Sequence, residues 1–597
     1  MRFPSISALA ARAWAVLLRF PWVLAAGLVA ATAGIMAVER EANDAWVRLA
    51  MVSALGLPLG VALTLFAERW AWSGWKKTTL LALGALCLAG FFQVWAGVES
   101  KHDAIRYFQL SAGIHLLVAF LPFAAVAERR GFWEYNRRLF EGFLSAAVFS
   151  LVLYLGLMIA LVALKQLFGI DIPDQNYLRL WFVIAFIVDP WIFLGFAPES
   201  LPDLEAERDY PRALKVFTQY ILTPLVAVYL VILIAYLFKV LATGEWPRGW
   251  IGYLVASVAV TGILGFLLVH PLRTREDEGW IRTYSRWLYV GLIPAAIMFL
   301  LALWKRVDPY GLTELRFLGL VMGAWLLGVA ILYTVKRDFG IRIIPVSLAA
   351  LLLLTLYGPV SATSLSVRSQ VRRLHGLLQS NGLTGAATIS ERPGVSREDL
   401  REISGTLRYL LEHRAAAGLQ SAFGRPLPEL DSPMELDRDV ESTAARIMER
   451  MHLAYLPAWA GATEAEDVVT FRAAPDSSAT RISGYDYAVR VDQQSPVAYA
   501  GGDTLTLAGD SLAGSLALLR GDDTLMVVRL APLVDSLLAL APVQRFQIEG
   551  PRMRIEATGP GARGLLLLRS VTGGRMEGVM RVRAWSGELY FALNGEQ

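Results

Sequence analysis

The sequence predicts an α-helical polytopic membrane protein with about 11 transmembrane helices, followed by an extramembrane α+β domain with a β-rich sandwich or open barrel. Hydrophobic residues make up 55% of the 597 residues, and the mean hydropathy is +0.47, as expected for a chain that is solvated largely by lipid. Apolar runs of about 20 residues, long enough to cross a hydrocarbon core of about 30 Å, recur as far as Ser361. Beyond this residue, the pattern changes to amphipathic helices and then to alternating strands.

The predicted transmembrane domain covers residues 20–361, and a short N-terminal segment precedes it. We expect segment 1–19 to be an amphipathic cytoplasmic helix on the membrane surface, because ten further apolar runs argue against a cleaved secretory signal. The eleven apolar runs lie at 20–38, 47–67, 78–98, 106–126, 140–164, 178–197, 217–241, 250–269, 285–304, 317–335 and 342–361.

Basic residues predict how these helices are oriented. The N-terminus and every second connection after it hold 20 Lys and Arg, whereas the connections between them hold 11. Because basic loops remain on the cytoplasmic side, the N-terminus is predicted to be cytoplasmic, and an odd number of spans places the C-terminal domain on the other side. The net charge of +4 is explained by this topology, so no nucleic-acid partner is expected. The single cysteine, Cys87, excludes an intrachain disulfide framework.

Two further regions follow the spans. Residues 362–465 are predicted to form a helical extramembrane linker, with amphipathic helices at 396–413 and 432–453. Residues 466–597 are predicted to form a β-rich extramembrane domain, because short alternating segments are separated by turn pairs such as Gly-Asp and Gly-Pro. The last two of these segments lie at 575–585 and 587–593, and one helix is expected at 533–541.

Several stretches of the membrane domain are unusual in order and spacing. They are HLLVAFLPF (115–123), FWEYNRRLFEGFL (132–144), YILTPLVAVYLVILIAYLFKVL (220–241), EWPRGW (245–250), LVHPLR (268–273), DPYGLTELRF (308–317) and GPVSATSLSVRSQVRRL (358–374). The chain therefore resembles a bacterial family of multi-pass membrane proteins defined by a domain of unknown function, the one numbered four-one-five-three. The resemblance implies a fold and a location in the bacterial inner membrane, but no reaction and no catalytic residue.

Two polar residues lie within predicted spans. Asp189 is near the middle of the sixth span, where an ionised carboxylate costs roughly 2.5–3.5 kcal/mol on translocon scales, so it should face protein or water. His115 is near the middle of the fourth span, and a proton relay with Asp189 is chemically reasonable. Structural roles remain open for both residues. Asp189 could accept hydrogen bonds that Pro190 leaves unmade, and His115 could bond a backbone carbonyl.

A second group of candidates belongs to connections on the predicted external side. Arginine and aromatic side chains at the headgroup layer suit an anionic lipid, although they also suit span anchoring or docking of the soluble domain. These candidates are Trp246, Arg248, Trp250, Arg306, Tyr310, Glu314, Arg316, Arg368, Arg372 and Arg373.

Motifs for stronger chemistry are missing from the sequence. It contains no P-loop, zinc-protease, hydrolase or dinucleotide motif, so no catalytic residue, metal or cofactor is predicted. We favour a non-enzymatic envelope protein that presents an external binding, sensing or scaffolding module. The expected partners are the lipid bilayer, anionic headgroups or another envelope protein. A proton-linked transporter or lipid flippase that uses Asp189 is the first alternative, and a membrane-embedded enzyme acting on a lipid-linked substrate is the second.

Overall fold

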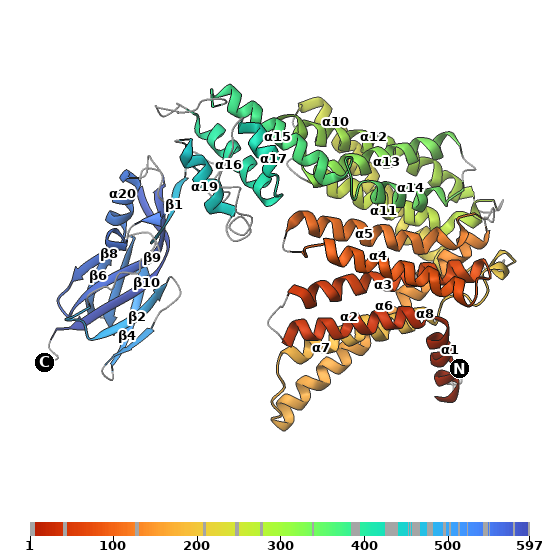
Figure 1. Ribbon diagram of the computed structural model, residues 1–597, viewed down its shortest axis with the longest axis horizontal. Coiled ribbons are helices and arrows are strands. Elements are labelled where there is room, and N and C mark those ends of the chain that lie inside the picture. Colours follow the sequence, from red (N-terminus) through yellow and green to blue (C-terminus); the bar gives the residue numbers. More distant parts are fainter. Residues whose placement is uncertain are drawn as a thin grey trace. The chain divides into compact units, whose positions relative to one another are not determined.

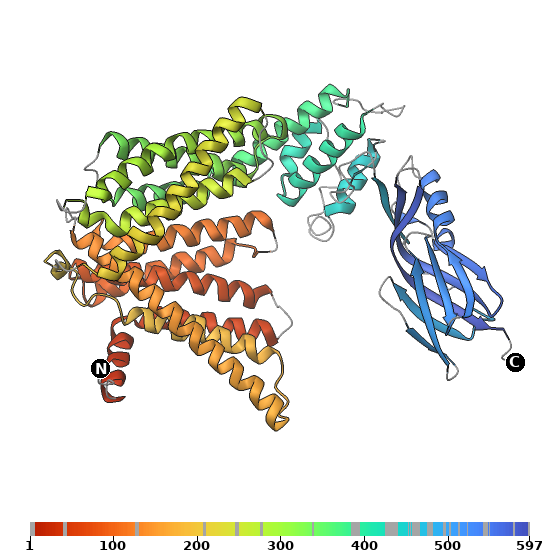
Figure 2. The same ribbon diagram turned by 180° about the vertical axis from the view of Figure 1, so that it is seen from behind.

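The structure is a computed structural model in which the chain forms two compact units, Met1–Gln370 and Val371–Gln597. Figures 1 and 2 show helices throughout the first unit, and helices followed by strands in the second. The structure describes residues 6–39, 44–98, 100–125, 130–206, 210–244, 250–274, 279–336, 340–383, 395–423, 440–451, 453, 455–456, 466–473, 482–492, 497–500, 503–510, 514–521, 523–540, 547–548, 550–576 and 579–594.

Long apolar helices dominate the first unit and confirm the predicted membrane architecture. Among the described residues, ten helices are long and apolar enough to cross a membrane, so the chain is a membrane protein. The helices are α1 (Ile6–Arg19), α2 (Pro21–Glu39), α3 (Asp44–Arg69), α4 (Trp75–Val94), α5 (Lys101–Phe120), α6 (Arg130–Phe168), α7 (Gln175–Val183), α8 (Asp189–Leu194), α9 (Arg212–Phe217), α10 (Thr223–Thr243), α11 (Trp250–Val269), α12 (Gly279–Tyr310), α13 (Glu314–Val335) and α14 (Ile343–Leu354).

The eleventh predicted span is shorter than the sequence suggests. Residues 342–361 contain α14, which has only 12 residues, because the chain turns at Gly358 and Pro359 before α15 (Ala362–Ser380) begins. Even so, α14 lies along α5. Arg342 Nη1 donates to Phe123 O at 2.5 Å, at one end of the span that contains α5, and Gln109 Nε2 donates to Leu352 O at 2.8 Å, near the middle of α5.

Two of the long helices contain a π-helical turn immediately before a proline. The turn Ile184–Val188 joins α7 to α8, which begins with Asp189-Pro190, and Thr218–Leu222 joins α9 to α10. Proline lacks an N–H, and its ring crowds the carbonyl oxygen four residues earlier. A π-helical turn is wider than an α-helical turn and relieves this clash. The carbonyl four residues before Pro190 is that of Phe186, and it points at Gly27 of α2, where a Cβ would lie 2.1 Å from the oxygen.

The helical part of the second unit includes the end of α15, because the division between the units falls inside that helix. The other helices are α16 (Arg397–Glu412), α17 (Ala416–Phe423) and α19 (Val440–Arg450). The first confirms the helix predicted at 396–413. The helix predicted at 432–453 is confirmed over the range of α19, and its first eight positions lie outside the described residues.

Two sheets form the β-rich part of the second unit. One has the order β2-β10-β9-β1-β7, with β8 also paired to β9, and the other has the order β3-β4-β5-β6. The strands are β1 (Glu466–Ala473), β2 (Tyr487–Asp492), β3 (Val497–Ala500), β4 (Asp503–Asp510), β5 (Ser515–Arg520), β6 (Asp523–Arg529), β7 (Gln547–Ile548), β8 (Arg554–Thr558), β9 (Ala562–Met576) and β10 (Val579–Leu593).

Both sheets contribute to a single apolar core, as expected for a β-sandwich. Leu505 and Leu516 from the smaller sheet and Leu566 and Leu589 from the larger sheet belong to the same buried cluster. The pairing is antiparallel except between β1 and β7. Helix α20 (Ala531–Leu540) packs against β9 and β10, which confirms the helix predicted among the strands.

Gly27 offers a test of how the π turn is accommodated. Replacing Gly27 with Ala should lower the stability of the detergent-solubilised protein by about 1–3 kcal/mol, because the added methyl group would overlap the Phe186 carbonyl. The matched control is Gly156→Ala in α6, where a Cβ would meet nothing within 4 Å, so it should be neutral or slightly stabilising. Thermal unfolding of both variants measures the difference. Equal midpoints would contradict the proposed close approach.

Candidate functional site

Asp189 lies at the first position of α8, directly after the π turn, and its side chain is only partly buried. Its carboxyl group faces Ser150 on α6, which packs against α8, but the buried Ser150 hydroxyl has no hydrogen-bond partner among the described residues. A carboxyl group next to a hydroxyl in a broken helix can exchange a proton or accept a hydrogen bond. Both the transport hypothesis and the structural alternative for Asp189 therefore remain open.

His115 lies on an exposed face of α5. Its Nδ1 is 2.8 Å from the backbone oxygen of Ser111, one turn earlier on the same helix. Because α5 packs mainly against α3 and α14, whereas α8 packs against α6, the two intramembrane candidates have different neighbours. The structure therefore does not bring His115 and Asp189 together as a relay.

On the predicted external side, the first part of α15 holds the loop between α12 and α13. Gln370 Nε2 donates to the carbonyl oxygens of Tyr310 and Leu312, at 3.1 and 2.9 Å. Ser369 Oγ accepts from the N–H of Leu312 at 2.9 Å. Arg316 closes the loop from α13, because its Nη1 donates to Gly311 O at 2.8 Å. These contacts, all within the first unit, define a structure that we call the α15 strap.

The remaining external candidates divide between structural contacts and exposed positions. Arg368 donates to Pro359 O at 2.7 Å, and Arg373 pairs with Glu402 of α16 at 3.1 Å within the second unit. Glu314 is buried in the first turn of α13, where a carboxylate suits the positive end of the helix. Arg306 and Arg372 are exposed. Trp246 and Arg248 lie outside the described residues, and of Trp250 only its position at the start of α11 is described.

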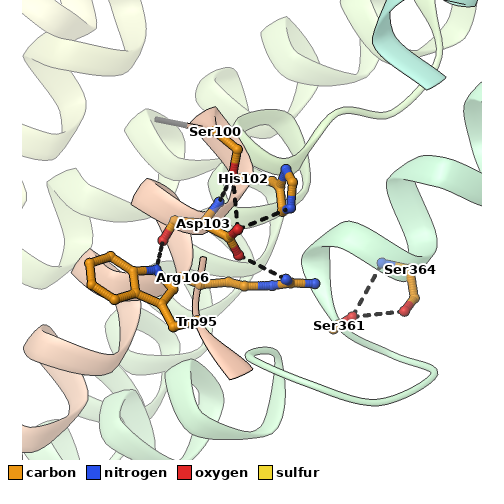
Figure 3. Close-up of polar contacts among 7 residues, drawn as sticks. All are labelled: Trp95, Ser100, His102, Asp103, Arg106, Ser361 and Ser364. Atoms are coloured by element: carbon orange, nitrogen blue, oxygen red, sulfur yellow. Dashed lines mark hydrogen bonds and ion pairs between the residues drawn. The ribbon is translucent and has the colours of Figure 1, made fainter. Parts of the chain in front are cut away.

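A polar cluster that sequence reasoning missed surrounds Asp103 at the start of α5 (Figure 3). The carboxylate is buried and accepts from Ser100 Oγ and from Arg106 Nη1, both at 3.0 Å. His102 Nε2 lies 3.5 Å from the same carboxylate. The indole N–H of Trp95 donates to the backbone oxygen of Asp103 at 3.0 Å. Ser100 also caps the helix, because its hydroxyl accepts from the N–H of Asp103.

This cluster lies beside the turn that follows α14. The guanidinium of Arg106 lies over the ring of Tyr357, 5.3 Å from its centroid. The Tyr357 hydroxyl keeps its proton at neutral pH, because the ordinary pKa of a tyrosine is about 10. At the start of α15, Ser361 accepts from the N–H of Ser364, whose hydroxyl donates to Gly358 O. Figure 3 shows Arg106 pointing from α5 toward this turn.

The cluster is suited to binding rather than to catalysis. Asp103 is engaged by three side chains, and is therefore not a free base. Among the described residues, no group of three or more His, Cys, Asp or Glu side chains could hold a metal ion. The sequence does carry a signal for this site. Ser100 and Asp103 have the spacing of a helix cap, and Arg106 follows Asp103 by three residues. In the prediction of orientation, Arg106 contributed only as one of the basic residues in the connections between spans.

The α15 strap can be tested through Gln370. Replacing Gln370 with Leu removes the donor to two carbonyl groups and should destabilise the loop by about 1–3 kcal/mol. We expect faster amide hydrogen exchange in peptides that cover residues 307–314. Gln379→Leu is the control, since Gln379 is exposed on the same helix. Unchanged exchange in the Gln370 variant, or equal acceleration in both variants, would argue against the strap.

Comparisons with known proteins identify the family to which the chain belongs. The protein PM1469 of Pasteurella multocida (strain Pm70), described as uncharacterized, is 25% identical over 198 residues. The match covers 32% of this chain and 32% of the length of that protein. No solved structure matches the chain. The model of the family described as "Domain of unknown function (DUF4153)" matches residues 17–385. Because this match covers more than half of the chain, the protein belongs to the DUF4153 family.

Proposed function

We propose that this membrane protein is a non-enzymatic envelope protein of the bacterial inner membrane that presents an extracytoplasmic module for binding, sensing or scaffolding. The proposed module consists of the helices after Gln370 and the β-sandwich. It has its own apolar core, in which Phe471, Leu566 and Leu589 are almost fully buried. A domain with such a core can fold and bind a partner without cysteine cross-links.

The observation that carries this proposal is the double role of α15. Ser369 and Gln370 attach its first part to the Tyr310–Leu312 loop of the membrane unit. Its later residues belong to the second unit, where Leu374 and Leu378 are fully buried and His375 contacts the backbone oxygen of Ala422. A helix that is held at both ends suits a chain whose membrane unit carries an external module.

The charge distribution supports the proposed orientation. The N-terminus and the loops on its side of the membrane hold 20 Lys and Arg, whereas the loops on the other side hold 11. Loops rich in basic residues favour the cytoplasmic side. Arg342 contacts Phe123 at one end of the span that contains α5, and Tyr357 contacts Arg106 nearer the other end, which supports an eleventh crossing. An odd number of crossings then puts the N-terminus and the second unit on opposite sides, with the N-terminus in the cytoplasm.

Cysteine accessibility tests this orientation. Replacing Cys87 with Ser removes the only native thiol, and single cysteines can then be placed at Ser73, between α3 and α4, or at Ser380, at the end of α15. Both positions are exposed. We expect a membrane-impermeant maleimide to label Ser380→Cys in spheroplasts and Ser73→Cys only after lysis. The opposite pattern, or labelling of both before lysis, would contradict the proposal.

A proton-linked transporter is the second candidate, because Asp189 lies beside Ser150 in a helix broken by a π turn. Non-helical geometry and acidic residues within spans are common in transport sites. In contrast to the favoured proposal, this one makes Asp189 essential and the second unit dispensable. The two proposals therefore predict opposite outcomes for two alterations of the chain.

Complementation of a deletion strain, scored by resistance to osmotic shock and detergent, separates the two candidates. For the module proposal we expect Asp189→Asn to restore wild-type resistance, because this change removes a charge but keeps the shape. A chain truncated after Gly382, which retains α15, should fail although it reaches the membrane in normal amounts. Failure of the Asp189 variant combined with activity of the truncated chain would overturn the module proposal in favour of transport.

A further inference from the structure

We propose that the start of α5, together with the turn after α14, binds the phosphate group of an anionic phospholipid, with Arg106 as the principal contact. This inference goes beyond the proposed function and does not depend on the orientation of the protein, since both leaflets present headgroups. It rests on the placement of charges around Asp103, on unused donors beside them, and on the apolar residues that flank the site.

The polar side chains are arranged so that the carboxylate lies beneath the imidazole and the guanidinium. The side chain of Asp103 is 8% exposed, whereas those of His102 and Arg106 are 16% and 23% exposed. Asp103 is also engaged by Ser100 from within the same turn. An anion that approaches the surface therefore meets the imidazole and the guanidinium before the carboxylate. A buried carboxylate that orients an arginine in this way restricts its conformations, so less entropy is lost on binding.

Donors for a phosphate remain around Arg106. Nη1 of its guanidinium is bonded to Asp103, and Nε is buried, so Nη2 provides the donors that suit phosphate oxygens. Tyr357 keeps its hydroxyl proton at neutral pH, because the ordinary pKa of a tyrosine is about 10. The exposed Lys101 adds a second cation one residue before His102. The site can therefore provide both charge and directed hydrogen bonds.

The surroundings favour a lipid over a free anion. The span that contains α5 begins at Lys101, so the cluster lies at the edge of the apolar layer, where headgroups are found. Leu354, Tyr357 and Val360, on the adjoining turn, are 66%, 45% and 56% exposed. Apolar and aromatic side chains at this level suit glycerol and acyl chains, and basic residues beside them attract anionic lipids.

Other arginines on the same face are less suited to this role. Arg316 and Arg368 donate to main-chain oxygens of nearby turns, so these donors are already used in holding the backbone. Arg306 is exposed at the end of α12, without a buried carboxylate described beneath it. It therefore provides a matched control for general attraction of anionic lipids to positive charge.

The test measures phosphatidylglycerol that remains bound to the purified full-length protein after exchange into a neutral detergent, by quantitative lipid mass spectrometry. We expect Arg106→Gln to weaken retention about tenfold or more, because a charge-assisted hydrogen-bond pair is lost. Tyr357→Phe should cause a smaller loss while it preserves the ring under Arg106. Arg306→Gln should retain wild-type amounts. Monodispersity in size-exclusion chromatography confirms that each variant is folded.

A competition arm distinguishes the two sources of phosphate. Millimolar inorganic phosphate should not displace phosphatidylglycerol, whereas added phosphatidylglycerol micelles should exchange with it. Retention that is unchanged in both Arg106→Gln and Tyr357→Phe would overturn the proposal. Equal losses in Arg106→Gln and Arg306→Gln would overturn it as well, since they would indicate unspecific charge attraction. Displacement by inorganic phosphate would reject the lipid as the occupant.

Discussion

The first unit depends on one constraint, which is that polar groups inside an apolar layer must find their partners within the chain. Water is absent from the hydrocarbon region, so an unpaired N–H or C=O costs several kcal/mol there. Several hydroxyl side chains in the spans accordingly donate to carbonyl oxygens one turn earlier, as Ser285 does to Ile281 O and Thr334 to Ala330 O. The π turn before Pro190 has a similar origin. The carbonyl of Phe186 loses its usual donor, and Gly27 leaves room for it.

The same constraint moves ionised groups to the ends of the helices and pairs them there. Arg19 binds Glu68 at 2.7 Å near the start of α2, and Arg137 pairs with the fully buried Glu134 in the first turns of α6. Asp103 and Arg106 form the corresponding pair at the start of α5. Asp189 is the exception, because its described neighbour is a hydroxyl and not a cation. The transport alternative therefore depends on Asp189.

Hydropathy was sufficient to predict ten of the spans, because a helix that crosses lipid needs a long apolar run. It also predicted the change to a β-rich region, because strands with one buried face alternate apolar and polar residues. Details set by tertiary contacts were not predictable in this way. Arg575 and Met576 of the segment predicted at 575–585 end β9, whereas its residues from Val579 onward and the segment predicted at 587–593 belong to one strand, β10, whose register shifts between Ser586 and Gly587. The contact of Arg106 with Tyr357 could not be predicted, because it joins segments about 250 residues apart and no local pattern encodes it.

The early end of α14 shows how the constraint determines topology. Twelve helical residues rise only about 18 Å, so this helix ends within a layer of about 30 Å. Its last carbonyls find donors there, because the N–H of Thr355 donates to Leu351 O at 3.1 Å and the buried Gln109 donates to Leu352 O. A re-entrant segment would return to the end from which it started. Here Arg342 is bonded at the Phe123 end of the span that contains α5, whereas Tyr357, on the turn after α14, lies against Arg106 nearer the Lys101 end. The chain after α14 therefore continues along α5 and does not fold back, and Gln109 supplies a donor at the depth where the short helix stops.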